Sequence, residues 1–171
     1  MTNDKAFASV AKIQAGLNQL AGPQKAVLQK VLGQAAIAQA SIGIRLSKTP
    51  YGEPFAALTS RVGKPLRRTG NNIQRSWTAG QETPAAFVFG SRFKWLATHQ
   101  YGAVIRPKRA KYLRFRMEST GKALLRRLEV TIPRRQMIPE KDTGGLGSRW
   151  TNAFKRTAKG YLEKLFKAEA A

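Results

Sequence analysis

Apolar residues at the start of the chain recur at steps of three and four residues, the repeat of one helical face. This stripe runs from Phe7 to Leu20. The next segment also has apolar residues on one side and predicts a helix from about Pro23 to Ser47. Gly22-Pro23 ends the first segment, and proline suits the first turn of the next helix. Residues 1–47 are therefore expected to form N-terminal helices.

The apolar period changes from 3.6 to 2 in the second half of the chain. Residues 111–117 place Leu113 and Phe115 on one face and Arg114 and Arg116 on the other. Residues 127–132 alternate in the same way. The pattern predicts a β-hairpin of these two stretches, with an apolar inner face and an arginine-rich outer face.

Shorter elements fill the rest of the chain. The spacing predicts a helix over 55–62, a strand over 85–89 and a helix over 93–100 that ends at Gly102. Ser148 is the expected cap of a last helix. The apolar stripe of that helix is Trp150, Phe154, Ala158, Tyr161 and Leu165.

These elements predict an α+β fold. An antiparallel or mixed β-sheet with a β-hairpin packs against N-terminal and C-terminal α-helices. The boundaries are helices over 1–47 and an α+β core with a C-terminal helix over 48–171. A length of 171 residues fits one domain overall.

Positive charge dominates the composition. Thirty-one Lys and Arg against nine Asp and Glu give a net charge of +22, and 103–135 alone holds eleven basic and two acidic residues. Such a field favours polyanionic partners. The candidate partner-facing or DNA-facing residues are Arg106, Lys108, Arg109, Lys111, Arg114 and Arg116. A solvated hairpin tip explains the loop 106–111 equally well.

Catalytic chemistry finds little support in the residue types present. The chain has no cysteine and one histidine, His99. Its acids form no close pair suited to acid–base work, and no metal-ligand spacing occurs. We expect no enzyme activity, no metal and no cofactor. The tryptophans Trp77, Trp95 and Trp150 fall at apolar positions of predicted helices, so core packing is favoured over base stacking. No run of about 18 apolar residues predicts a membrane span.

Four short segments occur in an order that resembles the phage virion morphogenesis (tail completion) family. They are Pro50-Tyr51-Gly52 with the residues to Leu58, Leu66-Arg67-Arg68-Thr69-Gly70, His99-Gln100-Tyr101-Gly102 and Ile132-Pro133-Arg134-Arg135. The resemblance covers about residues 35 to 166. Its motif residues are Thr69, Gly70, His99, Gln100, Gly102, Pro133 and Arg135.

The resemblance implies a tail-terminator-like structural protein of the virion neck, assembled in the host cytoplasm. Such a subunit completes or terminates the tail and joins it to the head. The implied partners are other copies of the chain in a hexameric ring, the tail tube protein, head connector or stopper proteins, and packaged DNA through its phosphates. Composition alone favours an alternative, a sequence-independent nucleic-acid-binding module.

Overall fold

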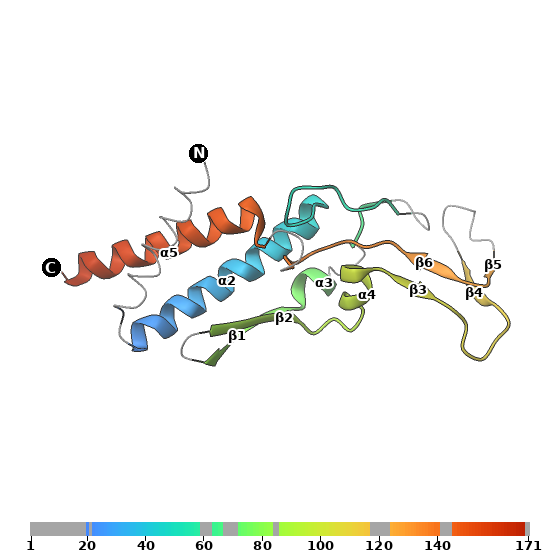
Figure 1. Ribbon diagram of the computed structural model, residues 1–171, viewed down its shortest axis with the longest axis horizontal. Coiled ribbons are helices and arrows are strands. Elements are labelled where there is room, and N and C mark those ends of the chain that lie inside the picture. The colour runs from blue at the N-terminus through green and yellow to red at the C-terminus, as the bar shows by residue number, and fades with distance from the viewer. Residues whose placement is uncertain are drawn as a thin grey trace.

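Two long helices lie side by side and contact each other (Figure 1). The structure, a computed structural model, describes residues 20, 22–58, 63–66, 72–83, 86–116, 124–140 and 145–169. The helices are α2 (Gly22–Leu46) and α5 (Gly147–Glu169). The predicted helix over 23–47 is confirmed. The stripe from Phe7 lies outside the described residues, apart from Leu20, which is buried.

Small residues allow α2 to approach its neighbours closely. Its buried positions include Gly33, Ala36, Ala40 and Gly43. A Cβ added at Gly33 would lie only 2.9 Å from the Cβ of Ala79 in the facing strand. Glycine at this position is therefore required by packing, although it disfavours a helix by about 1 kcal/mol relative to alanine.

We expect Gly33→Ala to lower the free energy of unfolding by about 1 kcal/mol, because overlap with Ala79 outweighs the gain in helix propensity. The matched control is Gly160→Ala in α5, where an added Cβ meets nothing within 4 Å. That control is expected to raise stability by up to about 1 kcal/mol. Urea unfolding of both variants measures the difference, and equal shifts would contradict close packing at Gly33.

Within the described residues, three two-stranded antiparallel sheets accompany the helices. They pair β1 (Trp77–Thr83) with β2 (Ala86–Ser91), β3 (Ala103–Ile105) with β6 (Val130–Ile132), and β4 (Leu113–Arg116) with β5 (Leu124–Arg127). Two short helices, α3 (Asn72–Arg75) and α4 (Leu96–Tyr101), complete the described elements. The fold is thus α+β, with small antiparallel sheets between helices near both ends, as expected at this coarse level.

The predicted hairpin of 111–117 with 127–132 is wrong. β4 pairs instead with 124–127, and 130–132 pairs with β3. The observed partner of β4 is closer in sequence, so less chain entropy is lost in closing the loop. Leu128, which the hairpin placed on the inner face, lies between the two sheets and is 67% exposed.

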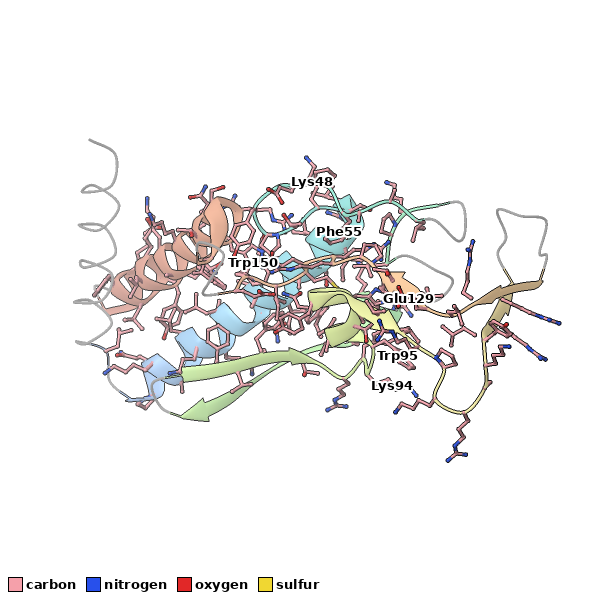
Figure 2. The ribbon with its side chains drawn as sticks, turned by 45° about the vertical axis from the view of Figure 1, so that its right-hand side comes forward. Lys48, Phe55, Lys94, Trp95, Glu129 and Trp150 are labelled. Atoms are coloured by element: carbon pink, nitrogen blue, oxygen red, sulfur yellow. The ribbon has the colours of Figure 1, made fainter. Side chains whose placement is uncertain are left out.

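Three smaller expectations also fail. Residues 55–58 are not helical, because the carbonyl oxygens of Ala56 and Ala57 accept hydrogen bonds from Arg135 instead of from a following helical turn. Trp95 precedes α4 and is 52% exposed (Figure 2). Ser148 lies inside α5, which begins one residue earlier.

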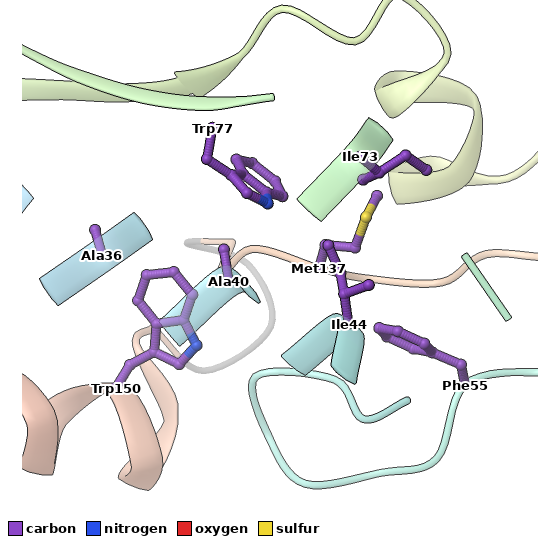
Figure 3. Close-up of a cluster of buried hydrophobic side chains, with 8 residues drawn as sticks. All are labelled: Ala36, Ala40, Ile44, Phe55, Ile73, Trp77, Met137 and Trp150. Atoms are coloured by element: carbon purple, nitrogen blue, oxygen red, sulfur yellow. The ribbon is translucent and has the colours of Figure 1, made fainter. Parts of the chain in front are cut away.

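The main core lies where α2, α5 and the β1–β2 hairpin meet (Figure 3). Figure 3 draws its buried residues, which are Ala36, Ala40, Ile44, Phe55, Ile73, Trp77, Met137 and Trp150. The ring of Trp77 stacks on that of Phe89 at 5.1 Å. Trp150 meets the same phenylalanine edge-on at 6.0 Å. The expected burial of Trp77 and Trp150 is confirmed, although Trp77 begins a strand and not a helix.

Candidate functional site

A narrow β-arm extends away from the long helices (Figure 1). We define the β-arm as residues 103–132, with the β3–β6 ribbon at its base and the β4–β5 ribbon at its far end. Two-stranded ribbons have too little apolar surface to be stable alone. Val104 and Leu128 of the β-arm are more than half exposed. The β-arm therefore presents both backbone and apolar surface that a partner can cover.

The six basic residues predicted from the sequence all belong to the β-arm. Arg106 follows β3 and forms an ion pair with Glu129, with its terminal nitrogen 3.0 Å from the carboxylate. Lys108 and Arg109 are exposed in the loop that leads to β4. The ammonium of Lys111 lies 5.5 Å from the ring centre of Tyr112.

The remaining two predicted residues lie on β4. Arg114 is exposed, and Arg116 ends the strand opposite Leu124. The side chain of Arg116 lies outside the described part of the structure. All six residues thus belong to the β-arm. Arg114 and Arg116 lie on β4, and the other four lie between β3 and β4.

Two further arginines belong to this surface; Arg126 was missed, and Arg127 was placed on the outer face of the predicted hairpin but not among the candidate partner-facing residues. Arg126 lies directly opposite Arg114, and Arg127 lies directly opposite Leu113. Because successive side chains alternate between faces, Arg127 belongs to the other face of the ribbon. The signal was the run Leu124-Leu125-Arg126-Arg127, which has no period of two and was therefore not recognised as a strand.

Positive charge on the β-arm is poorly compensated. The described part of the β-arm contains one acidic residue, Glu129, which forms an ion pair with Arg106. Within the described residues, no ion pair involves the other basic side chains, which are Lys108, Arg109, Lys111, Arg114, Arg126 and Arg127. Like charges directly opposite each other, as at Arg114 and Arg126, destabilise a ribbon unless an anion lies between them.

A buried polar cluster anchors the base of the β-arm. The side chain of Gln100 in α4 is 1% exposed. Its Oε1 accepts hydrogen bonds from the N–H groups of Met137 (2.8 Å) and Ile138 (3.2 Å). Its Nε2 donates to the carbonyl oxygen of Ile138 (3.0 Å) and to Glu140 Oε1 (2.6 Å). One side chain therefore fixes the segment that follows the β-arm against the helix that precedes it.

Arg135 links a third segment to this cluster. Its backbone N–H donates to the carbonyl oxygen of His99 at 2.7 Å. Its guanidinium donates to the carbonyl oxygens of Ala56 and Ala57, each at 3.0 Å. Arg135 is 5% exposed, so it acts as an internal brace and not as a surface charge.

Backbone geometry explains the two other motif residues that the structure describes. Gly102 has φ +77°, and an added Cβ would lie 3.1 Å from backbone atoms of Ile132 and Arg134. Pro133 directly follows β6 and has no N–H, so it cannot extend the β3–β6 ladder. Thr69 and Gly70 lie outside the described residues.

The surroundings of His99 favour the neutral form of its ring. Its Nδ1 is buried without a hydrogen-bond partner in the described structure. Burial, and secondarily the charge of Arg135, lower the pKa of His99 below its ordinary value of 6.5. An imidazole in this position makes a poor surface cation, so we assign it a structural role.

We expect His99 to make the protein less stable in mild acid. The unfolded chain binds a proton near pH 6.5 while the folded chain resists it, so the free energy of unfolding falls as the pH drops below that value. Urea unfolding at about pH 7.5 and about pH 5.5 measures the loss, and His99→Gln should reduce it. An equal loss in the variant would mean that other groups cause it.

Beyond the β-arm and its anchor, the described residues offer little for chemistry. They contain no group of three or more His, Asp or Glu side chains that could hold a metal ion. Among the described helices, none combines the length and apolar character that crossing a membrane requires. No family model, no curated protein and no solved structure matches this chain.

Proposed function

We propose that this chain is a structural subunit of the neck of a tailed phage. It completes or terminates the tail and joins it to the head connector or stopper proteins as part of a ring, with a tail-terminator-like fold. Its work is to occupy a place in an assembly, and no covalent bond is made or broken. The proposed location is the virion.

One observation carries the proposal. Three of the four segments through which the chain resembles the tail completion family meet in the cluster at the base of the β-arm: residues 50–58, 99–102 and 132–135. Gln100 and Arg135 make the contacts described above, and Gly102 allows the backbones to approach. Segments far apart in sequence that share one structural role support a common origin better than unrelated short matches do.

The shape of the molecule adds a second, weaker argument. A subunit of a ring needs a stable body and an element that reaches a neighbour. The α2–α5 body and the β-arm divide the chain in this way (Figure 1). The exposed apolar residues Val104, Ile105 and Leu128 would be covered in an assembly.

Light scattering of the purified protein at moderate salt tests the proposal. We expect a closed ring, or a monomer that assembles when uncapped tail tubes are added. The alternative function, a nucleic-acid-binding module, predicts a lone subunit that binds duplex DNA and ignores tail tubes. A monomer that does not associate with tail tubes would contradict the proposal, whatever its affinity for DNA.

A further inference from the structure

The far end of the β-arm has the charge and dimensions of a ligand for duplex DNA. We infer that the β4–β5 ribbon enters the major groove of DNA and contacts the phosphates on both walls without reading sequence. This inference deepens the proposed function, on which it rests, by naming the partner of the β-arm as the DNA that passes the neck.

The β-arm carries a strong positive charge, which favours binding to the phosphates of DNA. By sequence, the β-arm holds nine basic and two acidic residues, a net charge of +7. Of the two acids, Glu129 is paired with Arg106 at the base. Of the basic side chains toward the far end, those that the structure describes form no ion pair with a described acid; they are Lys108, Arg109, Lys111, Arg114, Arg126 and Arg127. Figure 2 shows long nitrogen-tipped side chains standing out from this part of the chain.

The cross-strand arginine pair supplies a specific anion site. Arg114 and Arg126 lie directly opposite each other in the β4–β5 register, and both side chains are exposed. Opposed Cβ atoms in such a pair lie about 5 Å apart. Phosphates bound by the two guanidinium groups offset their repulsion, and each phosphate can accept two hydrogen bonds from a planar fork.

Charge on both faces of the ribbon favours DNA over an acidic protein surface. Arg114 and Arg126 project from one face, and Arg127 projects from the other. A flat acidic surface would meet only one of these faces. The major groove, about 12 Å wide, accepts a two-stranded ribbon whose strands are about 5 Å apart and has phosphates along both walls.

Residue types limit direct reading of bases to guanine. Residues 103–132 contain no Asn or Gln, the side chains that pair with adenine in the major groove, whereas Arg and Lys can also bond guanine. We infer phosphate contacts alone, so affinity follows salt concentration and not base identity, and two duplexes of unrelated sequence test this point.

The test measures the affinity of the full chain for a labelled duplex of about 20 base pairs by fluorescence anisotropy, at salt from about 0.05 to 0.3 M. We expect the double substitution Arg114→Gln and Arg126→Gln to reduce the slope of log affinity against log salt by about two, one per lost phosphate contact. Two duplexes of unrelated sequence should be bound equally well. The matched control is Lys164→Gln with Lys167→Gln, which removes the same charge from exposed positions of α5.

Each outcome decides the inference. A lower slope for the β-arm variant, with the slope of the α5 control nearly unchanged, supports it. Equal slopes in both variants would mean that total charge, and not the β-arm, attracts DNA. Arm-dependent binding of polyglutamate without binding of the duplex would identify an acidic protein surface as the partner and would also overturn the inference.

A second pair of substitutions guards against misfolding. If circular dichroism shows that the ribbon variant is unfolded, Lys108→Gln with Arg109→Gln changes loop residues outside every β-pairing and should also lower the slope by about two. Ring formation in light scattering separates the proposed function from the DNA contact. A β-arm variant that forms rings but binds DNA less well supports both proposals. If the wild-type protein forms rings and the salt slope does not depend on the β-arm, only the DNA contact is overturned.

Discussion

Replacing Trp150 by alanine is expected to lower the free energy of unfolding by about 4 kcal/mol. Trp150 is 2% exposed and meets Phe89 from β2 and Phe154 from α5 edge-on, each at 6.0 Å. Its removal leaves a cavity between α2, α5 and the β1–β2 hairpin that small neighbours such as Ala36 and Ala40 cannot fill. Urea unfolding followed by far-ultraviolet circular dichroism measures the loss.

Trp95→Ala is the matched control for this substitution. The same atoms are deleted, but Trp95 is 52% exposed and lies apart from the core (Figure 2). We expect a change within about 0.5 kcal/mol. Losses of equal size at the two positions would show that the core does not lie where α2, α5 and the hairpin meet.

Gln100→Ala has the second-largest expected effect, a loss of about 3 kcal/mol and about 10 °C in Tm. The substitution leaves the N–H groups of Met137 and Ile138 without their acceptor in a buried site. It also removes the donor to Glu140. A buried N–H group that loses its acceptor pays the full free-energy cost of lost hydration. For this reason a buried polar residue can contribute as much to stability as an apolar core residue.

Gln34→Ala in α2 is the corresponding control, because Gln34 is exposed and its loss removes no buried hydrogen bond. In thermal unfolding, we expect the Tm of Gln100→Ala to lie about 10 °C below the Tm of Gln34→Ala. We also expect Gln100→Ala to impair assembly, because the base of the β-arm loses its anchor. Full stability in this variant would contradict the structural role assigned to the His99-Gln100 segment.

Local periodicity predicted the elements whose signal lies within one short stretch. The helix over 23–47, the strand near 85–89 and the apolar stripe of α5 are all present. In β2 and α5, one apolar face packs against the body and imposes its repeat on the sequence, whereas the buried face of α2 includes small and polar residues such as Gly33, Ala36 and Gln39. The same reasoning identified the basic surface of the β-arm, because charge density is visible without knowledge of strand pairing.

Pairing itself could not be predicted from this pattern. β1 (Trp77–Thr83) reads WTAGQET, in which apolar alternation is weak because the inward-facing Ala79 is a small residue packed against Gly33 of α2. No described side chain of the β-arm is buried, so residues such as Leu128 are not constrained to one face and gave a misleading register. The contact between Arg135 and residues 56–57 joins positions nearly 80 apart in sequence. No local pattern encodes such a contact.

Electron microscopy of phage particles produced with and without this chain tests the proposed role most directly. The account predicts that loss of the chain yields separate heads and tails, with uncapped or overlong tubes, and that supplying the protein restores joined particles. Normal virions assembled in its absence would contradict the account.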